Sequence, residues 1–161
     1  MKKGELVALY RNLNQLGNLN GVKFSYAVAK NLNIIKPEIE ALEKSMELPD
    51  KYKEFDNARV ALVEKYAVKD ENGKPKKEKA DNGAEQYVLP TGPEEKKFNK
   101  EFEALKKEHK EAVDLRDKQV EEYTKMLTEE STVALYKVKL EFVPEAITTR
   151  QMAGIAEIIE E

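Results

Sequence analysis

Apolar residues recur at helical spacing along residues 94–130, in a run that is otherwise mostly charged. The run contains no glycine or proline, so its pattern predicts one long helix. At about 1.5 Å per residue the helix would span about 50 Å, more than the diameter of a domain of this size. We therefore expect it to project or to meet a partner, through a candidate interaction face formed by Phe98, Phe102, Leu105, His109, Val113, Val120 and Tyr123.

Two amphipathic patterns precede this run at the start of the chain. Leucines and a tyrosine at i, i+3, i+4 spacing predict a helix over residues 2–17, and a Gly/Asn-rich turn follows over residues 17–21. A second stripe over residues 22–47, with steps of four and three, resembles a coiled-coil seam. The two segments together predict a helical hairpin.

Pro37 lies inside the second predicted helix. Proline removes a backbone donor and clashes with the preceding turn, which costs about 3 kcal/mol if the helix stays continuous. The sequence therefore predicts a kink or break near Ile35 and Lys36. After Leu48-Pro49-Asp50, a third helical stripe runs to about Tyr66.

The character of the chain changes over residues 68–93. Turn-forming residues occupy 70–73 and 81–83, and a possible short strand lies at 87–89, so a hairpin or a mobile flap would both fit. Pro93 suits the first turn of the long helix, whose positive end Glu94 and Glu95 would complement.

Strict alternation of apolar and polar residues predicts a strand within residues 133–143. We expect this strand to pair with the segments that flank the turn at Asn72 and Gly73, since a single strand is unstable alone, although another copy of the chain is an alternative. Thr148 and Gln151 have capping-box spacing and predict a short C-terminal helix that continues through the isoleucines near residue 159.

These elements predict an α+β fold that is mostly helical, with a helical hairpin, one long charged helix and a small antiparallel β element. Charged residues make up 37% of the 161 residues and aromatic residues 7%, without tryptophan, so we expect a narrow core. The length predicts one domain with four successive parts, residues 1–67, 68–93, 94–130 and 131–161, in which the N-terminal helices pack on the long helix.

Charge and composition narrow the class of function. The net charge of −3 disfavours general attraction to a polyanion, and the absence of cysteine removes disulfides and thiolate chemistry. No apolar run approaches the length that crosses a bilayer. We expect a soluble protein of the cytoplasm without membrane contact.

No motif for catalysis is present. His109 is the single histidine, and Glu108 and Glu111 point to other sides of the predicted helix, so a polar residue on a partly open seam is the simpler interpretation. Residues 70–73 resemble a calcium loop only superficially, because the later acidic ligands are out of register. Phosphate-binding and nucleophile motifs are also missing. The sequence therefore predicts no catalytic residue, no metal, no cofactor and no enzymatic activity.

One cluster of basic residues offers a different function. A candidate basic patch formed by Lys74, Lys76, Lys77 and Lys79 lies near Tyr87 and would suit phosphate contact with base stacking. Glu78, Asp81 and Glu85 dilute this charge. Nucleic-acid binding is thus an alternative rather than the leading prediction.

Three passages carry a family resemblance: the amphipathic N-terminal helix pair, residues 61–66 followed by 69–74, and residues 98–101 before a short strand and a terminal helix. In this order they resemble a family of small, mostly uncharacterised proteins of tailed bacteriophages and prophages. The family's helix after the position of Phe98 is short, so residues 108–130 depart from it. The resemblance transfers no catalytic residue and implies a viral accessory or assembly protein in the bacterial cytoplasm.

The leading functional prediction is therefore a non-enzymatic accessory factor that binds a bacterial or viral protein, because the long charged helix offers more surface than one small core can cover. Self-association through that helix, giving a homo-oligomer, is its simplest version. The alternatives are a nucleic-acid-binding accessory protein and a structural or assembly component of the virion.

Overall fold

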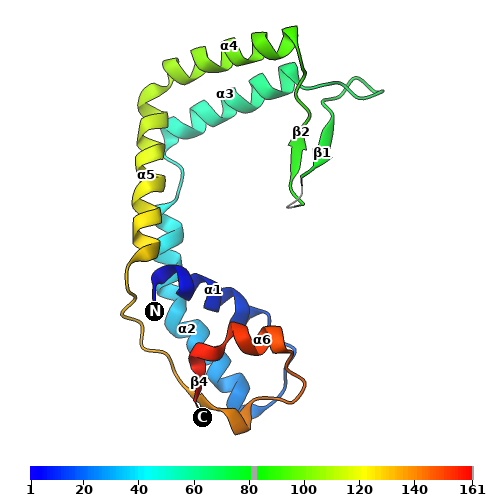
Figure 1. Cartoon of the computed structure of the whole chain (residues 1–161). Helices are drawn as coiled ribbons and strands as arrows, with labels where there is room; N and C mark the ends of the chain where they lie inside the picture. The colour runs from blue at the N-terminus through cyan, green and yellow to red at the C-terminus, as the bar shows by residue number, and fades with distance from the viewer. Residues whose placement is uncertain (81–82, 161) are drawn as a thin grey trace. The chain divides into compact units, whose positions relative to one another are not determined.

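The computed structural model describes residues 1–80 and 83–160, and its chain divides into two compact units. Unit 1 comprises Met1–Glu47 and Gln119–Glu161, and unit 2 comprises Leu48–Lys118. The described residues form mostly helices (Figure 1), with two short pairs of strands, so the predicted helical α+β fold is confirmed. The single domain stays a prediction, and we describe each unit by itself.

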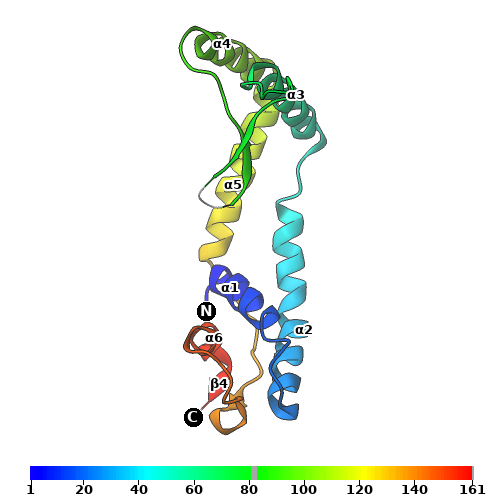
Figure 2. The same ribbon diagram turned by 90° about the vertical axis from the view of Figure 1, so that its right-hand side faces the viewer.

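Unit 1 is built on the predicted helical hairpin. Helices α1 (Lys3–Asn14) and α2 (Val22–Ser45) lie side by side (Figure 2). The chain enters α2 through Gly21, whose φ of 136° lies in a region that disfavours residues with a side chain. Apolar side chains of both helices and of the C-terminal segments form one buried cluster, which consists of Leu6, Leu9, Leu13, Leu16, Phe24, Ala27, Val28, Ile35, Ile39, Val138, Ile155 and Ile158.

Helix α2 runs without interruption through Pro37, so the chain has no break near Ile35 and Lys36, whereas the kink expected there stays a prediction. Ile35 is fully buried and Ile39 nearly so, which holds both turns around the proline against the core. The carbonyl that Pro37 leaves without a helical partner belongs to Asn33, an exposed residue. Packing of the two isoleucines therefore outweighs the local cost of the proline.

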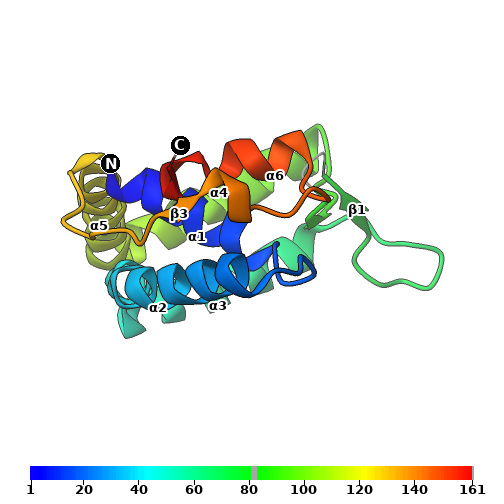
Figure 3. The ribbon, with the colours of Figure 1, turned by 90° about the horizontal axis from the view of Figure 1, so that it is seen from below.

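The segment predicted as a strand adopts a shorter and different structure. Strand β3 (Val138–Lys139) pairs in parallel with β4 (Ile159–Glu160), and the 3₁₀ helix η1 (Leu140–Phe142) follows it. The predicted pairing with the segments around Asn72 and Gly73 is therefore wrong. Figure 3 shows the chain before β3 running along α2. There the side chain of Asn31 on α2 forms hydrogen bonds with the backbone N–H and carbonyl of Tyr136.

The capping box at the C-terminal helix is confirmed. Thr148 Oγ1 accepts a hydrogen bond from the Gln151 backbone N–H at 3.3 Å, and Gln151 Oε1 accepts one from the Thr148 backbone N–H at 2.9 Å. Helix α6 (Thr149–Gly154) is shorter than predicted and gives way to the 3₁₀ helix η2 (Ala156–Ile158). Ile155 and Ile158 are both fully buried, and their burial stabilises the change from α6 to the 3₁₀ helix.

Unit 2 contains a second pair of helices and a hairpin. Helices α3 (Asp50–Tyr66) and α4 (Pro93–Glu108) lie side by side, and strands β1 (Lys77–Lys79) and β2 (Glu85–Tyr87) pair antiparallel (Figure 1). Of the two alternatives expected within 68–93, a hairpin or a mobile flap, the structure has the hairpin. The turn predicted at 81–83 falls partly on residues 81 and 82, which lie outside the described residues. Pro93 begins α4 as predicted, with Glu94 and Glu95 in its first turn.

The single helix predicted over residues 94–130 is wrong, because the chain ends α4 at Glu108 and begins α5 (Lys110–Thr128) after His109. His109 adopts φ −100° and ψ 25°, outside the helical region. The ring of His109 lies 5.7 Å from that of Phe55 on α3, and Lys51 at the start of α3 pairs with Glu111 at 3.1 Å. The turn at His109 therefore brings the first residues of α5 against α3.

Candidate functional site

The first part of the predicted interaction face packs inside unit 2. Phe98 is 7% exposed, and its ring lies 5.8 Å from that of Tyr66 on α3 and 5.7 Å from that of Phe102. Leu105 and His109 are half-buried, and His109 contacts Phe55. Phe98 and His109 of the predicted face thus contact α3, and Phe102 stacks on Phe98 within α4.

The remaining three residues of the face lie on α5. Val113 belongs to unit 2 and is half-buried, whereas Val120 and Tyr123 belong to unit 1. Val120 is 43% exposed. Tyr123 lines a hollow of about 440 Å³ together with residues of α1 and α2, including Tyr10 and Ile39. Partner binding by these residues stays a prediction.

Glu101 joins the two helices of unit 2 through polar contacts. Its carboxylate accepts hydrogen bonds from Lys65 Nζ at 2.7 Å and from the Tyr66 hydroxyl at 2.8 Å. The bond from Lys65, and then that from Tyr66, lowers the pKa of the Glu101 carboxyl below its ordinary value. The same contact with Glu101 raises the pKa of the Tyr66 hydroxyl.

The predicted basic patch lies on and beside the hairpin of unit 2. Lys74, Lys76, Lys77 and Lys79 are all exposed. Lys76 pairs with Glu78 at 2.8 Å, and Lys77 Nζ lies 4.8 Å from the centre of the Tyr87 ring. The Tyr87 hydroxyl donates to Glu64. Two of the lysines and the stacking candidate Tyr87 are therefore engaged within the unit.

Across residues 1–80 and 83–160, no cluster of three or more His, Asp or Glu side chains has the arrangement that holds a metal ion. His109 lies against Phe55 rather than beside a carboxylate. Within the same residues, no helix is long and apolar enough to cross a membrane.

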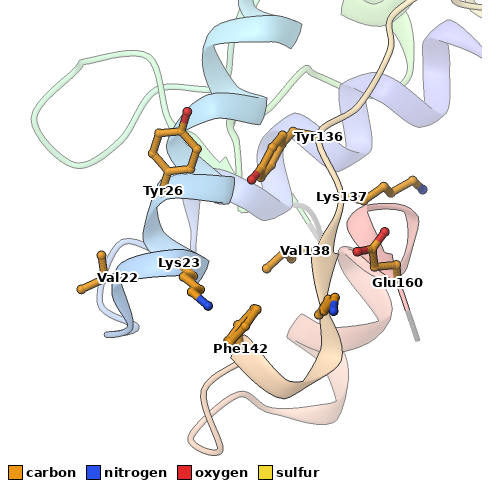
Figure 4. A pocket seen from close by; sticks show the side chains of 9 residues that line it. Val22, Lys23, Tyr26, Tyr136, Lys137, Val138, Phe142 and Glu160 are labelled. Atoms are coloured by element: carbon orange, nitrogen blue, oxygen red, sulfur yellow. The ribbon is translucent and has the colours of Figure 1, made fainter.

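Unit 1 contains a surface hollow with aromatic side chains in its lining, which we call the aromatic groove (Figure 4). It is a hollow of about 430 Å³ between the start of α2 and the segment through β3 and η1. Its lining consists of Val22, Lys23, Tyr26, Tyr136, Lys137, Val138, Lys139, Phe142 and Glu160.

The aromatic groove exposes apolar surface that the core does not use. Tyr26 is 57% exposed and Val22 is 90% exposed, and Leu140, next to the lining in sequence, is 50% exposed. The rings of Tyr26 and Tyr136 meet edge to face, with centres 5.7 Å apart. This edge-to-face contact fixes the positions of the two rings while leaving part of each accessible.

Two lysines lie against aromatic rings at the groove. Lys23 Nζ lies 3.7 Å from the centre of the Phe142 ring, and Lys30 Nζ lies 4.1 Å from that of Tyr136. Such cation–π contacts hold long side chains near the groove without neutralising their charge. The Lys137 ammonium donates to the backbone carbonyl of Glu157.

Asn31 on α2 holds in place the side of the groove that contains Tyr136. It is fully buried, and its side-chain amide donates to the Tyr136 carbonyl at 2.8 Å while its oxygen accepts from the Tyr136 N–H at 2.8 Å. A third hydrogen bond, from the Asn31 amide to the Ala27 carbonyl at 2.9 Å, fixes the side chain to α2. The groove is therefore a fixed part of unit 1.

The candidate residues named from the sequence did not include the groove. One signal for it was available: residues 6–37 contain no Asp or Glu, although the chain has 31 acidic residues, and residues 131–140 contain none either. These two segments are far apart in sequence, and only the fold brings Lys23 into one lining with Lys137 and Lys139 and places Lys30 against the Tyr136 ring.

No protein-family model, curated protein or solved structure matches this chain. The resemblance to phage proteins remains a prediction, and function has to be argued from the residues themselves.

Proposed function

We propose that this chain is a non-enzymatic accessory factor that binds another protein, and that the aromatic groove of unit 1 is where a segment of that protein docks. The observation that carries the proposal is the exposed aromatic and aliphatic surface of the groove, with Tyr26 and Val22 each more than half exposed. Aromatic residues in a hollow with a charged rim are typical of the centre of protein interfaces. A viral accessory role in a bacterial cell is the setting that we propose.

The lining residues support binding more than catalysis. Their polar groups are lysines, tyrosine hydroxyls and one glutamate, with no histidine or serine. No group in the lining combines a nucleophile with an adjacent general base. An interaction role requires only the apolar surface and the charges that are present.

A photo-crosslinking experiment tests the proposal. A photoreactive phenylalanine analogue replaces Tyr26 in the full chain, or Leu89 in a control; Leu89 is 40% exposed and lies in unit 2. After illumination in bacterial lysate, with and without phage infection, mass spectrometry identifies the captured protein and the cross-linked segment. We expect capture through position 26 and not through position 89.

Binding of the purified captured protein then has to depend on the groove. Tyr26→Ser and Tyr136→Ser should each weaken binding by about tenfold or more, the size expected for a central aromatic contact. Leu89→Ser should bind like the wild type in the same calorimetric titration. Equal affinities of all variants would show that the groove is not the docking site.

A further inference from the structure

We infer that the segment bound in the aromatic groove is acidic, with an apolar side chain inserted between the rings and carboxylates that meet the surrounding lysines. This inference rests on the proposed function, because it names the chemistry of the partner for the same groove. Three features of the groove support it: the distribution of charge, the contacts of the lysines and the size of the hollow.

The distribution of charge is the first argument. Two segments without Asp or Glu, residues 6–37 and 131–140, supply the lysines around the groove in a protein whose net charge is −3. The lining holds three lysines and one carboxylate, that of Glu160. Glu141 and Glu157 lie on adjoining elements, and Lys137 is bonded to the backbone of Glu157 rather than to its carboxylate.

The contacts of the lysines are the second argument. Over residues 1–80 and 83–160, no ion pair involves Lys23, Lys30, Lys137 or Lys139. A partner's carboxylate would therefore gain an ion pair without displacing one that the protein already has. Complementary surface charge of this kind makes binding more specific and association faster.

The rings favour a peptide over a nucleic acid. Lys23 already covers one face of Phe142, and Lys30 covers one face of Tyr136. Binding of single-stranded nucleic acid relies on open aromatic faces on which successive bases stack. An apolar side chain needs only the edges and gaps between the rings, which remain accessible.

The size of the hollow is the third argument. About 430 Å³ accommodates a few side chains and not a folded surface. Exposed apolar surface adjoins it, since the lining residue Val22 is 90% exposed and Leu140, which follows the lining lysine Lys139, is 50% exposed. An extended segment that crosses the groove would cover both, whereas a small anion would cover neither.

The test uses the full chain, labelled with nitrogen-15, and four synthetic probes. The first probe is a peptide of Phe and Leu flanked by Asp and Glu. In the second every acid is replaced by Lys, and in the third every apolar residue is replaced by Ser. The fourth is a single-stranded thymidine oligonucleotide. Amide chemical shifts report where each probe binds, and titration gives the affinity.

We expect the acidic apolar peptide to shift amides of residues 22–30 and 136–142. The Lys peptide and the Ser peptide should bind about tenfold more weakly or not at all, because the first lacks the carboxylates and the second lacks the apolar side chains. Tighter binding of the oligonucleotide at the same amides would overturn the inference in favour of nucleic acid. Equal binding of the acidic and basic peptides, or shifts elsewhere, would overturn it as well.

A charge-matched pair of variants isolates the lysines. The variant K23Q/K30Q/K137Q/K139Q should bind the acidic peptide about tenfold more weakly and with less dependence on salt. The variant K96Q/K100Q/K107Q/K118Q removes the same charge from exposed positions of α4 and α5 in unit 2 and should bind like the wild type. Equal losses in both variants would mean that net charge, and not the groove, attracts the peptide.

The photo-crosslinked partner separates the two proposals. If position 26 captures a protein whose cross-linked segment is basic or uncharged, the groove binds protein and only the inferred acidic chemistry fails. If position 26 captures nothing and the acidic peptide also leaves the groove amides unshifted, both proposals fail together.

Discussion

Asn31 shows how one side chain can replace a neighbouring strand. Its amide pairs with both the N–H and the carbonyl of Tyr136, the same two groups that an adjacent strand would satisfy. Asn31 is the one polar residue in the buried set of the part of the chain that the structure describes. Such a residue is stable in a core only because every polar atom has a partner.

Asn31→Ala should lower the free energy of unfolding by about 2–4 kcal/mol, because three hydrogen bonds are lost and the backbone of Tyr136 is left unsatisfied. Asn33→Ala, at an exposed position of the same helix, should change it by less than about 0.5 kcal/mol. Urea unfolding measures both. A loss below about 1 kcal/mol for Asn31→Ala would show that water replaces the amide.

Glu101 gives a prediction about pH. Its pKa is lowered in the folded state, so its contacts stabilise the fold above the pKa of the unfolded carboxyl, and this stabilisation is lost as the pH falls through the folded pKa. NMR titration should place Glu101 below the ordinary value of 4.5. In Lys65→Gln the pKa of Glu101 should rise, since its main stabilising partner is gone. A value of 4.5 or above in the wild type would contradict the structure.

At the scale of elements, sequence patterns predicted what local chemistry decides. The stripe on α2, the proline that begins α4, the hairpin within 68–93 and the Thr148 capping box are all present. Each depends on residues close together in sequence, so periodicity and cap chemistry suffice to find it.

Long-range contacts decided what the sequence could not predict. No glycine or proline marks the end of α4 at His109, where the histidine ring contacts Phe55 on α3. Most of the segment 133–143 does not form the expected strand. In its place the backbone of Tyr136 pairs with the side chain of Asn31, which lies 105 positions away in sequence. The aromatic groove was missed for the same reason, because its two sides come from distant segments.

Pro37 tests how far tertiary packing outweighs the low helix propensity of a proline inside α2. Pro37→Ala should raise the free energy of unfolding by about 1 kcal/mol or more, because it restores the hydrogen bond to the Asn33 carbonyl and removes a clash. The loss of proline's restraint on the unfolded chain offsets part of this gain. Lys36→Ala, also exposed on α2, is the control and should change little. No gain in Pro37→Ala would mean that the proline is fully accommodated.

At the scale of the whole molecule, the two units differ in how much apolar surface they bury. Unit 1 contains a cluster of twelve buried hydrophobic residues. Among the described residues of unit 2, only Phe55, Ala67, Phe98 and Ala112 are buried to this degree. Apolar burial is the main favourable contribution to folding, so unit 2 depends more on helix pairing and surface contacts.

Hydrogen exchange should therefore distinguish the units. The slowest amides should lie in the central turns of α2, between Ala27 and Ile39, and amides of α3 and α4 should exchange about tenfold faster or more, as expected for a region that opens by local unfolding. Mass spectrometry or NMR on the full chain measures both in one experiment. Equal protection of α2 and α3 would show that the chain opens as one cooperative body.

The division of the chain also has a consequence during translation. Unit 2 is continuous, whereas unit 1 is assembled from Met1–Glu47 and Gln119–Glu161. As the ribosome synthesises the chain, α1 and α2 emerge with the apolar face that will later receive Val138, Ile155 and Ile158 still uncovered. Unit 2 can form while that face is still uncovered, so we expect the hairpin of α1 and α2 to stay exposed until the second segment of unit 1 has been synthesised.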